Sequence, residues 1–401
     1  MSNALSNPVI ESEEHRALRA AVAALAKRYG REYFATVVAE GRHTDELWQE
    51  AAKAGYLGVN LPEEYGGGGA GITELSLVLE ELGAAGCPLL MLVVSPAICG
   101  TVIARFGTEE QKRTWLPGLA DGSRKMAFGI TEPDAGSNSH RITTTARKEG
   151  GDWVLNGRKI FVSGVDIADA TLIVGRTEDA GTGKLKPCLF IVPREAPGFG
   201  RSPVAMELAA PEKQFELTLD DVRLPADALV GGGPSHAFGS GGEDAGLLQL
   251  FAGLNPERIM TAAFALGMGR YALARAVDYA RTRQVWKEPI GAHQALAHPL
   301  AQCHIELELA ALMMRKAALL YDAGDDMAAG EAANMAKYAA AEAAVHTVDQ
   351  AVHTLGGNGL TREYGLASLV TAARVARIAP VSREMILNFV SHQSLGLPKS
   401  Y

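Results

Sequence analysis

The chain has 401 residues, of which 47% are hydrophobic and 21% are charged, a balance typical of a globular protein with room for two or three domains. A formal net charge of -8, without any basic run, argues against a nucleic-acid-binding protein. No stretch approaches the ~18 consecutive apolar residues of a membrane span, and the start of the chain lacks the order of a signal peptide, so we expect a cytoplasmic protein. The four cysteines lie far apart and fit buried thiols in a reducing compartment: Cys87, Cys99, Cys188 and Cys303.

The first part of the chain has the period of amphipathic helices. Helices are predicted near residues 13–30, 43–55, 72–85, 92–106 and 109–120. Thr108 is a good N-cap, and Gln111 three residues later completes the pattern of a capping box.

The hydrophobic period changes to two between Lys125 and about Gly231. Strict alternation from Phe215 to Asp220 and apolar runs at 126–130, 171–174 and 188–192 predict short strands. Asn156-Gly157, flanked by apolar residues, predicts a hairpin turn. Several short strands without intervening helices favour an antiparallel sandwich or barrel.

A Gly-, Ser- and Pro-rich stretch at 231–246 is predicted to be a loop between domains, and helical periodicity returns after it. Pro256 suits the first turn of a long helix, which would place Glu257 near that helix's N-terminus. Three helix faces follow from the spacing: Met260, Phe264, Met268 and Tyr271; Ile305, Leu309, Leu312 and Leu319; Val345, Val348, Val352 and Leu355. The predicted organisation is an N-terminal α-helical domain (1–123), a middle β domain (124–235) and a C-terminal helical bundle (236–401).

Several segments could carry chemistry, and each also has a plain structural interpretation. The strand end at 131–138 offers N–H groups and hydroxyls to a ligand, or is only a tight turn. The glycines at 356–359 let a phosphate or ribose approach the backbone, or simply end a helix. Arg283 could pair with a pyrophosphate, or be solvated. Glu257 could be a general base, or only offset a helix dipole.

Other catalytic patterns are missing from the sequence. The ten histidines show no HExxH or similar spacing, so we predict no metal site. There is no GxSxG nucleophile motif and no phosphate-binding GKS/T loop.

The order and spacing of the motifs resemble the acyl-CoA dehydrogenase family over nearly the whole chain. The matching segments are Gly55–Gly67, Phe128–Pro133 with Gly136 and Ser137, Asn156–Ser163, Asp221–Pro225, Arg283 with Pro289–Gly291 and Gln294, and Gly356–Gly359. The resemblance implies a helical domain, a β barrel and a four-helix bundle. It also implies non-covalent FAD held between subunits of a homo-oligomer, a dimer or a tetramer built from two dimers.

The resemblance also implies roles for individual residues. The flavin ring would meet Phe128, Ile130, Thr131, Phe161 and Ser163. The neighbouring subunit would supply Arg283, Trp286, Gln294 and Gly357. His353 and Gly356 would also lie near the cofactor. Near the nucleotide half of FAD would lie Ser382 and Glu384. The CoA arm would meet Ser137 and Asn255, and the floor of the site would carry Arg258.

The catalytic base is placed in two ways within that family. Most members carry a glutamate in a C-terminal motif whose matching stretch here is 378–382, with Pro380 at the glutamate position. The isovaleryl and long-chain types carry it just before an arginine of the long helix, which fits Glu257-Arg258. The implied reaction removes the α-proton of an acyl-CoA with Glu257 and passes the β-hydride to flavin N5, giving a trans-2-enoyl-CoA.

Pro380 raises a difficulty, because relatives polarise the thioester carbonyl with a main-chain N–H at this position and proline has none. Three alternatives therefore stand beside a dehydrogenase that passes electrons to an electron-transfer flavoprotein. They are an acyl-CoA oxidase, a flavin monooxygenase and a non-catalytic FAD- or acyl-CoA-binding subunit. The length of the chain disfavours the oxidases, and Glu257 disfavours the monooxygenases, which generally lack a base.

Overall fold

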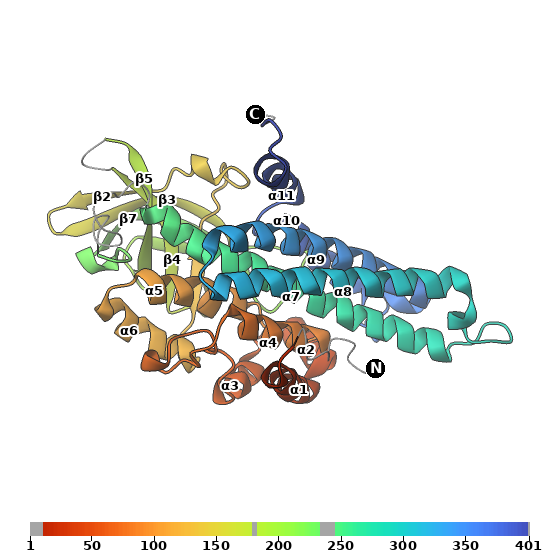
Figure 1. Cartoon of the computed structure of the whole chain (residues 1–401). Helices are drawn as coiled ribbons and strands as arrows, with labels where there is room; N and C mark the ends of the chain where they lie inside the picture. Colours follow the sequence, from red (N-terminus) through yellow and green to blue (C-terminus); the bar gives the residue numbers. More distant parts are fainter. Residues whose placement is uncertain (1–10, 179–182, 233–244, 400–401) are drawn as a thin grey trace.

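The computed structural model describes residues 11–178, 183–232 and 245–399. Helices, then a β-sheet, then long helices follow one another along the chain, which confirms the predicted fold class (Figure 1). In this view the sheet lies to the left and the long C-terminal helices extend to the right. Within the described ranges, no helix is long and apolar enough to cross a bilayer. All four cysteines are buried and free, as predicted.

The N-terminal part is helical at the predicted places. Its helices are α1 (Glu13–Lys27), α2 (Gly30–Ala39), α3 (Asp45–Lys53), α4 (Ile72–Ala84), the π-helical segment η2 (Val93–Gly100), α5 (Thr101–Phe106) and α6 (Glu109–Ala120). The predicted capping box is present, because Thr108 Oγ1 accepts from Gln111 N–H at 3.2 Å and Gln111 Oε1 accepts from Thr108 N–H at 3.0 Å. The sequence did not reveal α2, which begins at a glycine with a φ of 67°.

Seven strands form one mixed sheet in the order β1-β4-β2-β3-β7-β6, with β5 also paired to β4. The strands are β1 (Met126–Gly129), β2 (Thr145–Glu149), β3 (Asp152–Ser163), β4 (Ala170–Glu178), β5 (Leu185–Pro193), β6 (Phe199–Val204) and β7 (Gln214–Leu224). Most neighbours are antiparallel, as expected, but β1 and β2 both run parallel to β4.

The predicted hairpin turn at Asn156-Gly157 is wrong. Strand β3 runs straight through both residues, with a shift of register opposite β7. Asn156 pairs across the sheet instead, since its Nδ2 donates to Asp221 Oδ1 and its Oδ1 accepts from Asp221 N–H, both at 3.0 Å. A Cβ on Gly157 would lie 2.4 Å from Thr144 Oγ1, so the glycine allows a β-bulge rather than a turn.

The C-terminal part consists of long helices packed side by side. They are α7 (Ala245–Thr282), α8 (Gln294–Asp322), α9 (Asp326–Leu355), α10 (Ala367–Ile378) and α11 (Arg383–Phe389), with the short η6 (Gly356–Leu360) after α9. Most of the predicted linker at 231–246 falls on residues 233–244, outside the described residues. Its last two residues already belong to α7.

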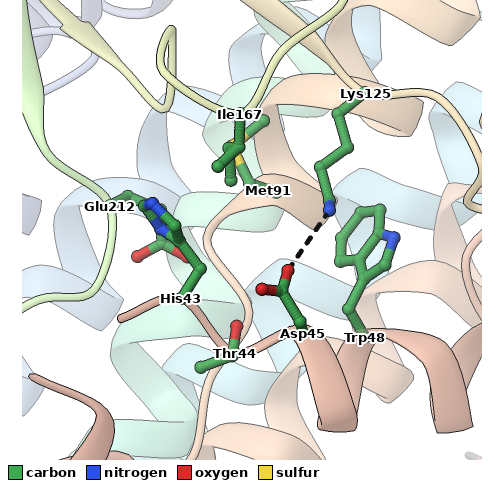
Figure 2. A pocket seen from close by; sticks show the side chains of 8 residues that line it. All are labelled: His43, Thr44, Asp45, Trp48, Met91, Lys125, Ile167 and Glu212. Carbon is green, nitrogen blue, oxygen red and sulfur yellow. Dashed lines mark ion pairs between the residues drawn. The ribbon is translucent and has the colours of Figure 1, made fainter. Parts of the chain in front are cut away.

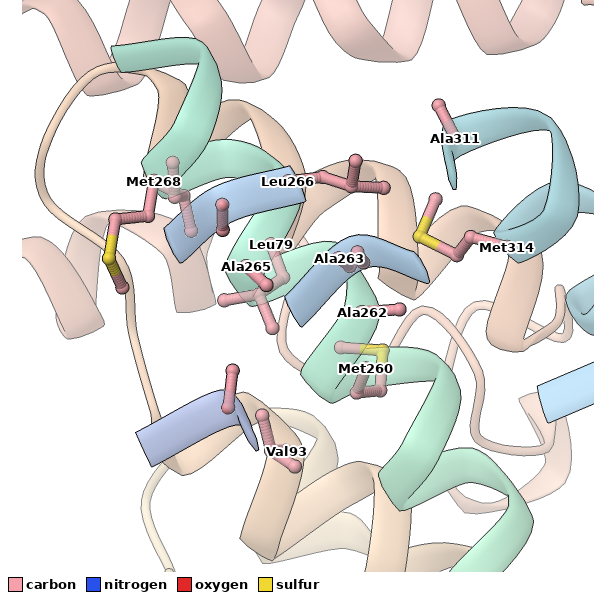
Figure 3. Close-up of a cluster of buried hydrophobic side chains, with 14 of the residues drawn as sticks. Leu79, Val93, Met260, Ala262, Ala263, Ala265, Leu266, Met268, Ala311 and Met314 are labelled. Carbon is pink, nitrogen blue, oxygen red and sulfur yellow. The ribbon is translucent and has the colours of Figure 1, made fainter. Parts of the chain in front are cut away.

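Helix α7 lies at the centre of the largest hydrophobic core. Figure 3 shows its Met260, Leu266 and neighbouring alanines between side chains of α4, η2 and α8. Small residues bring the backbones close together, because a Cβ on Gly83 of α4 would lie 2.9 Å from the Cα of Gly267. This packing fixes α7 tightly against the N-terminal helices, and it therefore fixes the side chains that α7 carries towards the sheet.

Candidate active site

The end of strand β1 forms one wall of the candidate site. Phe128, Ile130 and Thr131 are all partly exposed there. The carbonyl of Thr131 accepts a hydrogen bond from Ile160 N–H at 2.9 Å, so the strand end lies against the middle of β3. The structure thus brings together the two segments that the sequence assigned to the flavin ring.

A buried ion pair holds this wall in place. Lys159, with no exposed surface, donates to Glu132 Oε1 at 2.8 Å and to the Ile130 carbonyl at 3.0 Å. Glu132 also accepts hydrogen bonds from the N–H and hydroxyl groups of Thr143 and Thr144. Burial would raise the pKa of Glu132, but the hydrogen bonds from Lys159, Thr144 and Thr143 outweigh it and lower the pKa to about 2.

Phe161 adopts an unusual conformation for a residue inside a strand. Its φ is 57°, in the left-handed region, and its ring is 55% exposed at a second register shift of β3. Ser163, two residues on, exchanges hydrogen bonds with the Gln214 side chain at 2.9 and 3.1 Å. A non-glycine residue with positive φ costs free energy, so a presented aromatic ring here fits a binding surface.

The sequence placed Glu257 near the N-terminus of its helix, but this was wrong. The helix α7 begins at Ala245, and Glu257 lies well inside it. Pro256 is tolerated there because the carbonyl it cannot serve, that of Ala252, accepts a hydrogen bond from Tyr321 Oη at 2.9 Å. The helix-dipole interpretation of Glu257 therefore fails, since that effect falls off within the first turn.

The carboxyl group of Glu257 is buried without full hydrogen bonding. Its Oε2 has no partner among the described residues. Burial raises the pKa of Glu257 to about 7, although the positive charges of Arg258 and Lys337 oppose the shift. The Cys99 thiol of η2 feels the charge of Glu257 and contacts the Ala127 carbonyl of β1 at 3.4 Å. Glu257 therefore lies near Cys99 of η2, a residue that itself contacts the first strand.

Several predicted substrate residues surround this carboxyl group or the strand end. Asn255 is 6% exposed, and its Oδ1 accepts from Arg258 Nη1 at 3.1 Å. Arg258 Nε is buried without a partner in the described part of the chain. Ser137 is exposed in the turn that follows β1.

The segment after α10 approaches the same region. Ser382 caps α11, because its hydroxyl accepts from Met385 N–H at 3.3 Å, and Glu384 is exposed in the first turn of that helix. Lys337 of α9 donates to the Val381 carbonyl at 2.5 Å. Sequence reasoning missed Lys337, because nothing in the local pattern marks a lysine inside an Ala-rich helix.

A second group of predicted cofactor residues lies far from Glu257. The group comprises Arg283, Trp286, Gln294, His353, Gly356 and Gly357, and all are exposed. Helix α7 extends about 38 Å from Glu257 to its C-terminal end just before Arg283. Asn358 Nδ2 donates to Tyr279 Oη at 3.0 Å, which ties the glycine segment to that same end. Within one chain, these residues cannot share a site with Glu257.

Sequence reasoning also missed a small polar pocket between the N-terminal helices and the sheet. Figure 2 shows His43, Asp45, Lys125 and Glu212 around it, and Lys125 pairs with Asp45 at 3.8 Å. Glu212 is 6% exposed, and burial, with the nearby charge of Asp166, raises its pKa to about 7. This pocket has almost no free volume, which makes it a structural junction rather than a substrate site.

Comparison with known proteins identifies the whole architecture. Three family descriptions match successive parts of the chain: acyl-CoA dehydrogenase N-terminal domain (residues 12–123), middle domain (127–222) and C-terminal domain (244–395). The chain belongs to the acyl-CoA dehydrogenase family. By this membership it is an acyl-CoA dehydrogenase, a class of oxidoreductase that uses FAD.

Individual relatives cover nearly the full length of this acyl-CoA dehydrogenase. It is 67% identical over 392 residues to acyl-CoA dehydrogenase FadE12 of Mycobacterium tuberculosis, with 98% of each chain covered. A glutaryl-CoA dehydrogenase from Mycobacterium smegmatis in complex with FADH2 is 26% identical, with a TM-score of 0.88 and 99% and 98% coverage. A chain of the electron transferring flavoprotein structure from Acidaminococcus fermentans is 29% identical, with a TM-score of 0.87 and 96% and 98% coverage.

Proposed function

We propose that Glu257 is the general base that removes the α-proton of an acyl-CoA thioester, giving a trans-2-enoyl-CoA. One observation carries the proposal: Glu257 has a buried carboxyl oxygen without a hydrogen-bond partner in the described part of the chain, and burial raises the pKa of this group to about 7. A base of this pKa is ionised for much of the time near neutral pH and still accepts a proton readily. The neighbouring Arg258 and Lys337 favour the ionised form.

The wall of the site suits a flavin. The exposed Phe161 ring offers a flat apolar face, and Thr131 and Ser163 place hydroxyl and main-chain groups beside it. We infer that Phe128, Ile130, Thr131, Phe161 and Ser163 hold the isoalloxazine, and that Ser382 and Glu384 lie near the nucleotide half. When bound, FAD supplies the acceptor for the β-hydride. We assign Asn255 and Ser137 to the CoA arm and Arg258 to the floor of the site.

The distant group at the other end of α7 supports a site shared between chains. A Cβ on Gly356 or Gly357 would meet no atom within 4 Å, so a ligand could approach this backbone closely. Since Arg283, Trp286 and Gln294 cannot reach Glu257 in their own chain, we infer that they contact the FAD of a neighbouring copy.

An apolar stripe on α8 supports the same assembly. Ile305, Leu309, Leu312 and Leu319, predicted as one helix face, are 58%, 62%, 42% and 51% exposed. A contiguous exposed stripe of this kind is typical of an interface with another protein. We therefore propose a homo-oligomer, a dimer or a tetramer, that covers the stripe.

The redox partner and the cellular setting are also proposals. We infer that an electron-transfer flavoprotein accepts the electrons, a role consistent with the likeness to a chain of the Acidaminococcus structure. The four free, buried thiols support a reducing, cytoplasmic compartment. Acyl-CoA substrates would place the enzyme in fatty acid β-oxidation.

Anaerobic flavin reduction tests the proposed function. The purified protein should be yellow, and a panel of acyl-CoA thioesters should bleach its visible band. Glu257→Gln should remain yellow but lose bleaching by at least ~10³-fold, because an amide cannot accept the proton. Glu110→Gln, which changes an exposed glutamate of α6, is the matched control and should bleach normally.

Two results would contradict the proposal. Bleaching of Glu257→Gln at the normal rate would assign the base to another residue. Oxygen consumption that matches turnover without an added acceptor would show an oxidase in place of a dehydrogenase.

A further inference from the structure

Lys337 of α9 is a buried lysine whose charge acts on Glu257, but whose own position in the site the proposed function does not explain. Its side chain is 1% exposed and is among the largest fully buried side chains of the described chain. A buried ammonium group is costly unless hydrogen-bonded and paired, so its surroundings show what it does. Its Nζ donates to the Val381 carbonyl at 2.5 Å, which ties α9 to the segment directly after Pro380.

The same ammonium group faces the charged residues of the active site. Burial lowers the pKa of Lys337 to about 8, so the group is still largely charged at neutral pH. Of the charged residues that act on it, Arg258 and Glu257 of α7 come first, followed by Glu342 of its own helix and Glu384 of α11. From the other side, Glu257 faces the Arg258 and Lys337 charges and the Cys99 thiol of η2. Lys337 is therefore one of two cations that oppose the effect of burial on this carboxyl group.

The hydrogen bond from Lys337 to Val381 and the effect of the Lys337 charge on Glu257 come from the same ammonium group. The Pro380–Val381 segment follows α10 and leads into Ser382 at the start of α11. Proline cannot donate a main-chain hydrogen bond, so this segment has one fewer group with which to fix its position. A side chain that binds the next carbonyl supplies the missing anchor, and it carries a positive charge to the base at the same time.

We propose that Lys337 is a positioning residue of the active site: its buried ammonium group fixes the Val381 segment through the carbonyl hydrogen bond and places a positive charge near the Glu257 carboxyl group. The inference rests on the proposed role of Glu257 as the base. It adds a second requirement to that role: the proton acceptor needs a nearby positive charge to work near neutral pH.

Three substitutions in the full-length, FAD-loaded enzyme separate the two effects. Lys337→Met removes both the charge and the hydrogen bond, Lys337→Gln removes the charge but keeps an N–H donor, and Lys337→Arg keeps both. The rate of anaerobic flavin reduction by an acyl-CoA that reduces the unmodified enzyme is measured by stopped flow from pH 5.5 to 9.

The pH profile is the decisive readout. Because the reaction needs ionised Glu257, loss of a nearby positive charge should move the acid limb of the Met and Gln variants to higher pH by about one pH unit. Near pH 6 this shift lowers the rate by about tenfold. The Met variant should also show a lower plateau at high pH, because the Val381 carbonyl has lost its donor. The Arg variant should keep the original acid limb.

The controls distinguish this inference from a general loss of folding and from failure of the base assignment. Lys316→Met, at an exposed lysine of α8, should leave the pH profile unchanged. An unshifted acid limb in both Lys337→Met and Lys337→Gln, with Glu257→Gln inactive, would overturn the role of Lys337 alone. Normal reduction by Glu257→Gln would instead overturn the base assignment. If the Met variant does not fold, the Gln and Arg variants still decide the matter.

Discussion

Glu132, just after β1, and Glu257 in α7 both have buried carboxyl oxygens near the candidate site, yet their chemistry is opposite. Glu132 accepts hydrogen bonds from Lys159, Thr143 and Thr144, and its pKa falls to about 2. Glu257 keeps an oxygen without a partner, and its pKa rises to about 7. Burial is common to both, so the partners decide whether a carboxylate is a fixed charge or a proton acceptor.

Glu212 shows that a raised pKa alone does not identify a base. Its pKa also rises to about 7 through burial, but it lines the small polar junction of Figure 2, with His43, Asp45 and Lys125. What separates Glu257 from Glu212 is location: the charge of Glu257 acts on Cys99 of η2, whose thiol contacts β1, whereas the charges of Asp166 and Lys125 act on Glu212. The two similar pKa values therefore carry different meanings.

The largest effect on stability is expected from breaking the buried ion pair between Lys159 and Glu132. Lys159→Met leaves Glu132 buried without its cation, which should lower the free energy of unfolding by ~3–5 kcal/mol. Because Lys159 also holds the Ile130 carbonyl, FAD should bind more weakly as well. Urea denaturation measures the first effect and flavin release during dilution measures the second.

A double variant provides the control for this prediction. Lys159→Met with Glu132→Leu removes both charges and should recover much of the lost stability, since an apolar pair of similar volume replaces the ion pair. If the single variant unfolds at the same urea concentration as the unmodified protein, the pair does not hold the wall.

Features that depend on neighbouring residues were predictable from the sequence. The Thr108–Gln111 capping box joins two residues three positions apart, and the structure contains it as expected. The three-part fold followed from changes of hydrophobic period, and the family resemblance reinforced it. Local spacing therefore determined which elements exist and in what order.

Features that depend on distant contacts were not predictable. Asn156-Gly157 has the local pattern of a turn, but a partner 65 residues away, Asp221, keeps it within a strand. Pro256 has the pattern of a helix start, but the helix begins earlier. The Ala252 carbonyl, which Pro256 cannot serve, accepts a hydrogen bond from Tyr321, 69 residues away. The assignment of Glu257 as the base does not depend on that wrong boundary, because it came from the adjacent arginine and not from the helix end.

An intermediate effect is expected for Glu212→Gln. The unfolded glutamate titrates near 4.5 and the folded one near 7, so its neutral form is favoured by folding. Neutral Glu212 therefore makes its full contribution to the free energy of unfolding below pH 4.5. The unmodified protein loses this contribution as the pH rises towards 7. Glutamine is never charged, so the variant should match the unmodified protein near pH 5 and exceed its stability by ~2–3 kcal/mol at pH 8. Urea denaturation at both pH values measures the difference, and equal stability at pH 8 would contradict the raised pKa.

The smallest effect on stability is expected for Glu257→Gln, the same substitution that should abolish flavin reduction. The sign is the same as for Glu212, because the pKa of Glu257 is also raised from 4.5 to about 7 and its ionisation above that range destabilises the fold. The residue as a whole is partly exposed although its Oε2 atom is buried, and in the variant Arg258 and Lys337 lose the negative charge on which they act. We therefore expect the free energy of unfolding to increase by ~1 kcal/mol at pH 8 and not to change near pH 5, measured by urea denaturation of the flavin-free protein.

A variant that is both inactive and slightly more stable would show that the fold retains this carboxylate for its chemistry. A loss of stability at pH 8 would instead place Glu257 with Glu132, among the carboxylates that hold the structure together.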